Sequence, residues 1–158
     1  MGPAGSGKST VGRALATRLR WTFLDADDLH SEDAIAKMAR GTGLDDDDRS
    51  GWLDRVNAAM RDAADAGAAL VVACSALRER YRTRLANGIP VLHWVHLRTD
   101  PATLRHRLEA RDGHFAGPAL LGTQLEALEP PIDALDVDAA APVERIVDAI
   151  CRALRLPC

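Results

Sequence analysis

Apolar residues recur with two different periods along the chain, and together they predict alternating helices and strands. After the opening loop, Val11, Leu15 and Leu19 fall on one face of a helix that starts at Lys8. Further helices are expected over "SEDAIAKMARG", "DRSGWLDRVNAAMRDAADAG", "LRERYRTRLANG", "DPATLRHRLEARDG", the stretch before Pro130 and "APVERIVDAICRAL". Short apolar runs predict strands at residues 22–26, 68–75, 91–98 and 134–139. This alternation predicts a parallel sheet in one α/β domain over residues 1–158.

The opening stretch "MGPAGSGKST" fits the phosphate-binding pattern G-x-x-x-x-G-K-[ST]. Its glycines let backbone N–H groups approach phosphate oxygens, and the following helix adds the positive end of its dipole. A chance glycine-rich terminus is disfavoured because the required helix follows. The predicted loop binds a nucleoside triphosphate, with Lys8 reaching the β- and γ-phosphates and Ser9 ligating Mg²⁺. The nucleotide-binding residues are Gly2, Ala4, Gly5, Ser6, Gly7, Lys8, Ser9 and Thr10.

A loop of this kind normally follows a buried strand, yet here the motif begins at residue 2. We therefore expect the first, central strand of the three-layer fold to be missing from this chain, and Met1 to be an internal methionine at a strand-to-loop junction. Burial of about five apolar residues contributes roughly 7–15 kcal/mol, comparable with the ~5–15 kcal/mol net stability of a domain. The chain as written is predicted to be unstable and to bind ATP poorly. A non-catalytic nucleotide-binding relic is the alternative.

Acidic residues in "FLDADDLH" follow the first predicted strand. Asp25 and Asp27 stand at its carboxyl end, where ligands gather in open α/β sheets. Two carboxylates there could hold water on Mg²⁺ and accept a proton from an attacking hydroxyl. Asp28 is expected only to cap the next helix.

Two charged clusters follow. In "LDDDDRSGW", residues 45–48 are either a solvated helix start favoured by the dipole or partners for substrate hydroxyls, and Arg49 could bind a carboxylate. In "RHRLEARDGHF", Arg107 and Arg111 share a helix face. Arg111 leads into Gly113 and His114, so a lid around residues 111–121 could close over the phosphates. An ordinary solvated basic face is the alternative.

Other features narrow the class of protein. The strand "LVVACS" ends in Cys74 and Ser75 instead of an aspartate, which argues against GTPases and motor ATPases and favours small-molecule or nucleotide kinases. A net charge of -3 argues against sequence-independent nucleic-acid binding. Three cysteines (Cys74, Cys151 and Cys158) suggest reduced thiols. No apolar run approaches the ~20 residues of a membrane span, and no signal peptide is expected before the motif, so we expect a cytoplasmic protein.

The order of these motifs resembles the gluconokinase family of small P-loop kinases, which are related to shikimate and adenylate kinases. The matching stretches are "MGPAGSGKST", "FLDADDLH", "KMARGTGLDDDDR", "VVACSALRERYR", "RLEARDGHF" and "LLGTQLEALEPP". They cover nearly the whole chain. The resemblance implies phosphorylation of D-gluconate on its 6-hydroxyl with ATP and Mg²⁺, and a homodimer as one assembly. A kinase for another small hydroxy acid, such as a shikimate-like substrate, is the alternative.

The resemblance also implies roles for individual residues. Lys8, Asp27 and Arg111 would be catalytic, with Asp27 as the base, and Asp25 would reach the magnesium ion through water. Arg107 would lie at the adenine or the phosphates. The substrate pocket would include Asp27, His30, Lys37, Asp46, Arg49, Arg78 and His114. The chain departs from the usual family pattern at Leu125, Asp45 and Gly51, and Asp45 adds negative charge near an anionic substrate.

Overall fold

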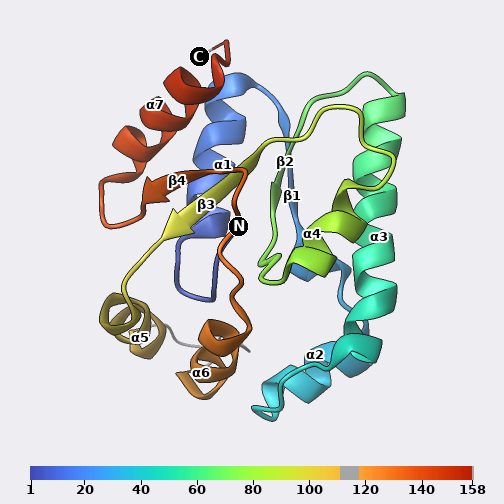
Figure 1. The fold of residues 1–158 in the computed structure, drawn as a ribbon, viewed down its shortest axis with the longest axis vertical. Coiled ribbons are helices and arrows are strands. Elements are labelled where there is room, and N and C mark those ends of the chain that lie inside the picture. The colour runs from blue at the N-terminus through green and yellow to red at the C-terminus, as the bar shows by residue number, and fades with distance from the viewer. Residues whose placement is uncertain (111–117, 158) are drawn as a thin grey trace.

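Parallel strands alternate with helices in the computed structural model, which describes residues 1–110 and 118–157 (Figure 1). The first half contains α1 (Lys8–Leu19), β1 (Thr22–Asp25), the 3₁₀ helix η1 (Ala26–Leu29), α2 (Glu32–Ala39), α3 (Asp46–Asp65) and β2 (Leu70–Ala73). The second half contains α4 (Glu79–Ala86), β3 (Trp94–Arg98), α5 (Pro101–Glu109), α6 (Pro118–Ala127), β4 (Ala134–Asp138) and α7 (Val143–Leu154). The predicted order of elements is confirmed.

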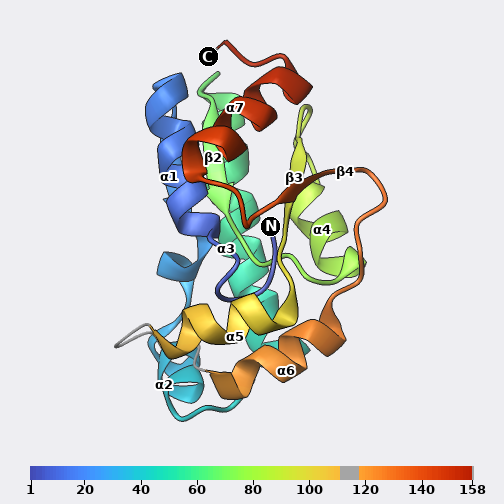
Figure 2. The same ribbon diagram turned by 90° about the vertical axis from the view of Figure 1, so that its left-hand side faces the viewer.

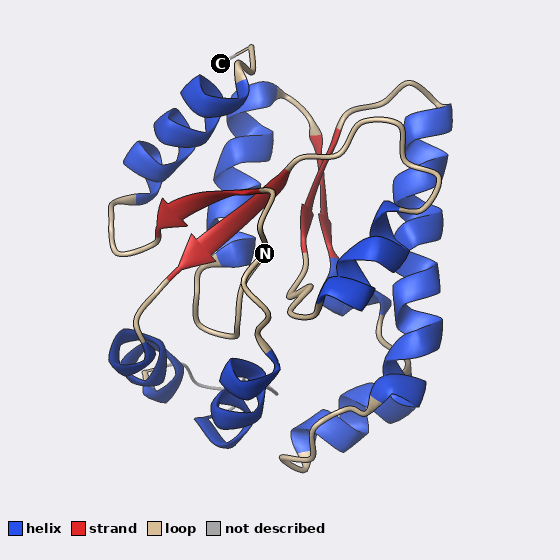
Figure 3. Cartoon of the chain, viewed as in Figure 1, coloured by secondary structure: helices blue, strands red, loops and turns tan. Residues whose placement is uncertain are grey.

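The strands form two separate parallel pairs within the described residues. β1 pairs with β2, from Thr22 opposite Leu70 to Asp25 opposite Ala73. β3 pairs with β4, from Trp94 opposite Ala134 onward. Figure 3 shows the two pairs standing apart, with the amino terminus between them. The parallel pairing was predicted, whereas the division into two pairs was not.

Met1 occupies part of the gap between the two pairs. Its amino group donates a hydrogen bond to the Val95 carbonyl, and its own carbonyl accepts one from the Leu97 N–H at 2.9 Å. On the other side, the Gly2 N–H donates to the Ser75 carbonyl at 3.2 Å. Figures 1 and 2 both place this terminus between β2 and β3. Hydrogen bonds of Met1 and Gly2 therefore connect the start of the phosphate loop to both pairs of strands.

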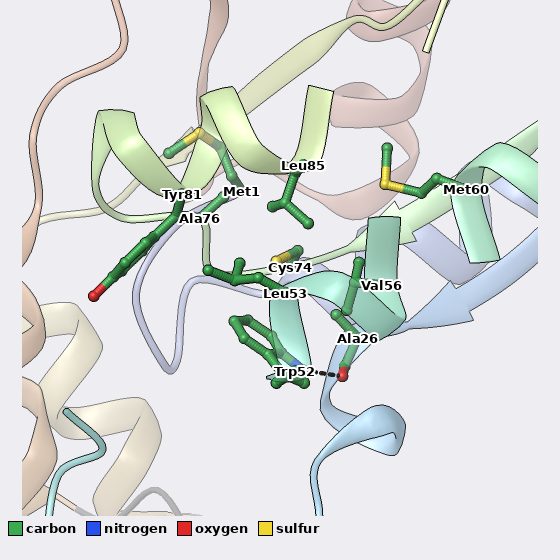
Figure 4. Packing of buried hydrophobic residues seen from close by; sticks show 10 residues of the cluster. All are labelled: Met1, Ala26, Trp52, Leu53, Val56, Met60, Cys74, Ala76, Tyr81 and Leu85. Carbon is green, nitrogen blue, oxygen red and sulfur yellow. Dashed lines mark hydrogen bonds between the residues drawn. The ribbon is translucent and has the colours of Figure 1, made fainter. Parts of the chain in front are cut away.

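Helices cover both faces of the strands. One apolar cluster joins α1 and α7 through Val11, Leu15 and Ile150. A second cluster, drawn in Figure 4, joins α3 and α4 through Trp52 and Leu85 and includes the side chain of Met1. A third cluster packs α2, α5 and α6 beneath the phosphate loop. The phosphate loop and the carboxyl end of β1 are thus packed against buried apolar clusters.

Several helices start at side-chain caps formed by nearby residues. Ser31 accepts a hydrogen bond from the Ala34 N–H at 3.2 Å at the start of α2. Asp100 accepts from the Thr103 N–H at 2.9 Å, and Pro101 takes the first position of α5. Asp45 and Asp48 form a reciprocal capping box at the start of α3. Part of the acidic run is therefore a helix cap.

The cysteines differ from the expectation. Cys74 is a free, buried thiol, but Cys151 is disulfide-bonded. The prediction of reduced thiols is wrong for Cys151, because an odd number of cysteines does not exclude one pair. Among the described residues, no helix is both long and apolar enough to cross a membrane.

Candidate active site

The phosphate loop depends on glycine at its turns. Gly5 and Gly7 have φ values of 81° and 91°, in the left-handed region that favours glycine. A Cβ atom at Gly5 would lie 3.1 Å from the Leu104 carbonyl oxygen, whereas the corresponding position at Gly7 has no neighbour within 4 Å. Gly7 immediately precedes α1, so its open side adjoins the positive end of that helix. The loop therefore offers backbone N–H groups to an anion at an accessible helix terminus.

Side chains brace this loop internally. The Lys8 Nζ atom donates to the Pro3 carbonyl at 2.9 Å, across the loop. The Ala4 N–H donates to Gln124 Oε1 at 2.7 Å, which ties the loop to α6. The Ser6 hydroxyl is buried, and no partner for it lies among the described residues. Thr10 is exposed on the first turn of α1.

Ser9 and Asp25 are brought together as the sequence suggested. The Ser9 hydroxyl lies 2.6 Å from Asp25 Oδ2. The other oxygen, Oδ1, accepts a hydrogen bond from the Asp27 N–H at 3.3 Å, so Asp25 also caps η1. A hydroxyl and a carboxylate are hard oxygen donors of the kind that Mg²⁺ binds directly or through water. These two side chains fit a magnesium ion beside the phosphate loop.

Trp52 holds the segment that carries Asp27, a role the sequence analysis did not assign. Its Nε1–H donates to the Ala26 carbonyl at 2.6 Å, and its ring stacks on His30 with centroids 4.5 Å apart. His30 Nε2 lies 3.9 Å from Asp27 Oδ1. The sequence places Trp52 inside a predicted helix and assigns no further role to it. Because the hydrogen-bond partner of Trp52 is 26 residues away, no local sequence pattern could have indicated this contact.

His30 is an uncharged group in this setting. Its side chain is only 4% exposed, and burial, followed by the charges of Arg49 and Arg55, lowers the pKa of His30 to about 4. Its Nδ1 atom is buried, with no hydrogen-bond partner among the described residues. A neutral imidazole is therefore packed beside the Asp27 carboxylate at neutral pH.

Tyr81 gathers three arginines, another feature that the sequence did not reveal. The guanidinium carbons of Arg49, Arg78 and Arg80 lie 5.8, 5.9 and 5.4 Å from its ring centroid. The Tyr81 hydroxyl donates to Asp46 Oδ1 at 2.5 Å. The pKa of Asp46 is lowered, first by the hydrogen bond from Tyr81 and then by the charges of Arg80 and Arg78. This group places positive charge beside the start of α3. The sequence feature that could have indicated this group is Tyr81 itself, because it is the only tyrosine in the sequence.

The residues that were predicted to bind the substrate do not all contact one another. Asp46 accepts hydrogen bonds from Tyr81 and Arg80, with Arg78 3.9 Å away. Lys37 instead bonds Asp48 and lies 3.4 Å from Asp45, both in the cap of α3. The structure thus joins Lys37 to a helix cap.

Arg107 lies against the phosphate loop from the opposite side. Its guanidinium donates to the Gly5 carbonyl at 3.4 Å and to the Ala139 carbonyl at 2.8 Å. Ala139 directly follows β4, so Arg107 links the loop to the far pair of strands. Arg111, His114 and the first part of the predicted lid lie outside the described residues. Arg105 and His106 are exposed.

A glycine-rich loop at the start of α1, parallel strands flanked by helices, and carboxylates at the end of β1 together define a P-loop kinase fold. A family model described as an AAA domain matches residues 1–131. The thermoresistant gluconokinase of Escherichia coli is 41% identical over 151 residues, which cover 93% of this chain and 86% of that protein.

Two solved structures extend the comparison. A sugar kinase from Janibacter, 35% identical, superposes with a TM-score of 0.92 and covers 99% of this chain and 92% of that chain. A gluconokinase from Sinorhizobium meliloti, 38% identical, has a TM-score of 0.87 and covers 98% of this chain and 89% of that chain. The chain belongs to the AAA domain family of P-loop proteins and, among these, to the gluconokinases.

Proposed function

We propose that this protein is an ATP-dependent gluconokinase that transfers the γ-phosphoryl group to the 6-hydroxyl of D-gluconate. The observation that carries the proposal is the junction of the phosphate loop with the end of β1. There the Ser9 hydroxyl lies 2.6 Å from Asp25, and Asp25 in turn accepts a hydrogen bond from the Asp27 backbone. Phosphate-binding and proton-accepting groups are therefore linked through two consecutive hydrogen bonds.

The chain stabilises the transferring phosphoryl group mainly by position and charge. Backbone N–H groups of residues 4–9 other than those of Ala4 and Ser6, which bond within the protein, would donate to the phosphates, and Lys8 would exchange the Pro3 carbonyl for their oxygens. Ser9 would hold Mg²⁺ directly and Asp25 would hold it through water, and the ion would neutralise charge on the β- and γ-phosphates. Arg107 would border the adenine side, and Arg111, which lies outside the described residues, stays a predicted catalytic residue.

Asp27 acts on the acceptor hydroxyl. Its carboxylate orients the hydroxyl and takes up its proton as the bond to phosphorus forms. The packed, neutral His30 keeps the carboxylate in position from one side. Trp52 fixes the backbone of η1 through Ala26, so the base is held on a rigid turn.

The arginines around Tyr81 bind the acidic end of the substrate. Arg49 donates from its Nε atom to the Leu44 carbonyl at 3.2 Å, and its terminal nitrogens would bind the substrate carboxylate. Arg78 lies over the same ring. A planar guanidinium pairs with a carboxylate through two parallel hydrogen bonds. Asp46 binds substrate hydroxyls from its place beside Tyr81.

A coupled assay of ADP release tests the proposal. Gluconate should be preferred over shikimate, glycerate, other sugar acids and nucleoside monophosphates, and the product should be 6-phosphogluconate by mass and NMR. Equal rates with these acceptors would contradict it. Fractionation and size measurements would test the further expectations of a cytoplasmic location and a homodimer.

A further inference from the structure

The loop over residues 74–78, which joins β2 to α4, holds Ala76 in an unusual backbone conformation. Its φ angle is 45°, in the left-handed region that residues with a side chain seldom occupy. Ala76 is also fully buried, within the apolar cluster drawn in Figure 4. A backbone conformation of this kind persists only where the surrounding structure enforces it, and it is often found beside functional groups. The contacts that hold Ala76 therefore bear on function.

Arg82 of α4 bonds directly to this strained part of the loop. Its Nη1 atom donates to the carbonyls of Ala76 and Leu77, each at 3.1 Å. The residue is only 8% exposed, and within residues 1–110 and 118–157 it forms no ion pair. A guanidinium stays charged in a protein, and a buried charge requires hydrogen-bond partners. The two loop carbonyls are the groups that satisfy it, so the buried cation and the left-handed conformation depend on each other.

The rest of the loop is anchored from two other places. The Ser75 carbonyl accepts a hydrogen bond from the Gly2 N–H at 3.2 Å. The Leu77 carbonyl also accepts one from the Glu129 N–H at 2.9 Å, and Glu129 Oε2 accepts from the Glu79 N–H at 2.6 Å, at the start of α4. The bond to the Ala76 carbonyl itself comes from Arg82. Arg82 is thus the side chain placed to fix the left-handed residue.

Arg78 is the last residue of this loop, two positions after Ala76. Its guanidinium carbon lies 5.9 Å from the centroid of the Tyr81 ring, and its Nη1 atom lies 3.9 Å from Asp46 Oδ1. A change in the φ angle of Ala76 rotates the chain that follows it. The direction in which Arg78 leaves the backbone is therefore set by the conformation that Arg82 holds.

We propose that Arg82 is a positioning residue for acceptor specificity: it keeps Ala76 left-handed and thereby places Arg78 against the acidic end of the acceptor. This inference rests on the proposed function, in which Arg78 belongs to the arginine group around Tyr81 that binds the substrate carboxylate. Arg82 acts through the loop and not by contact with the substrate, because its hydrogen bonds go to the loop carbonyls.

The test is a rescue by glycine, which adopts the left-handed conformation without strain. Arg82→Met keeps much of the side-chain volume but removes its donors, and should raise the KM for gluconate by about tenfold or more. The KM for ATP should change little. Adding Ala76→Gly to this variant should bring the KM for gluconate back to within about threefold of wild type. Ala76→Gly alone and Arg84→Met, on the same helix, are the controls and should stay near wild type.

Amide hydrogen exchange at Glu79 and Glu129 reports on the loop without substrate, because both N–H groups take part in its anchoring. Exchange at both should be about tenfold faster or more in Arg82→Met, and should slow again when Ala76→Gly is added. If Arg82→Met does not fold, Arg82→Lys with and without Ala76→Gly decides in its place.

The proposal is overturned if glycine restores neither the KM for gluconate nor the slow exchange. It is also overturned if the KM for ATP rises as much as that for gluconate, because Arg82 would then serve the whole fold. A wild-type chain without activity on gluconate would instead contradict the proposed function, and with it the role of Arg78. The exchange measurements would still decide whether Arg82 holds Ala76.

Discussion

Ser9 on the first turn of α1 and Asp25 at the end of β1 lie 2.6 Å apart, joined by a hydrogen bond between hydroxyl and carboxylate. This contact connects the phosphate loop to the strand that precedes Asp27. It also brings together the two oxygen groups that fit a magnesium ion. Removing the hydroxyl should therefore weaken metal use more than folding.

For Ser9→Ala, we expect the Mg²⁺ concentration at half-maximal activity to rise by about tenfold or more, as for the loss of a metal-supporting oxygen. Ser9→Thr should retain most of the wild-type response because it keeps the hydroxyl. Thr17→Ala, an exposed change on the same helix, is the matched control. A magnesium titration that is the same for Ser9→Ala and wild type would remove Ser9 from this role.

Asp27→Asn should lower kcat by about 10²–10⁴-fold, the usual contribution of a positioned general base. Binding of ATP should change little, because the phosphate loop is untouched. Asp28→Asn alters the exposed neighbour in η1 and should leave the rate near wild type. Steady-state kinetics and nucleotide titration measure both effects, and a nearly normal kcat for Asp27→Asn would exclude it as the base.

Arg49→Lys should raise the KM for gluconate by about tenfold while kcat changes less, because an ammonium cannot form two parallel hydrogen bonds with a carboxylate. The KM for ATP should stay constant. Arg84→Lys is the control, since Arg84 pairs with Asp54 between α4 and α3. If both variants shift the KM for gluconate equally, Arg49 does not bind the substrate carboxylate.

The lowered pKa of His30 predicts a pH effect on stability. Below its unfolded value near 6.5, the unfolded chain takes up a proton that the folded chain, with a pKa of about 4, does not. Stability from this group is complete above pH 6.5 and falls as the pH drops toward 4. His30→Gln should reduce the difference in unfolding free energy between pH 7 and pH 5 in urea titrations. The exposed control His106→Gln should preserve it.

The parts of the site that could be predicted are those encoded by neighbours in sequence. Gly7, Lys8 and Ser9 adjoin one another, and the caps at Ser31 and Asp100 use residues three positions away. Ser9 and Asp25 were each assigned to the same magnesium ion, but the hydrogen bond between them was not predicted.

Contacts between distant elements were not predictable from the pattern. Tyr81 reaches Asp46 across 35 residues, and Ala4 reaches Gln124 across 120. The acidic run "DDDD" also looked uniform in sequence. In the structure, Asp45 and Asp48 cap α3, whereas Asp46 turns to the hydroxyl of Tyr81. Which acid does what depends on the packing of α4 against α3.

Under the proposed function, the break between the two pairs of strands would lie between Asp27, the proposed base, and Arg107, the proposed nucleotide contact. Asp25 and Asp27 belong to the β1 and β2 side, whereas Arg107 bonds the Ala139 carbonyl beyond β4. Met1 and Gly2 are the backbone bridge between these sides. In-line transfer tolerates little misalignment, and an error of about 1 Å can cost about 10²-fold in rate. Under the proposed function, a change in the spacing of the two pairs of strands would therefore lower the rate of phosphoryl transfer.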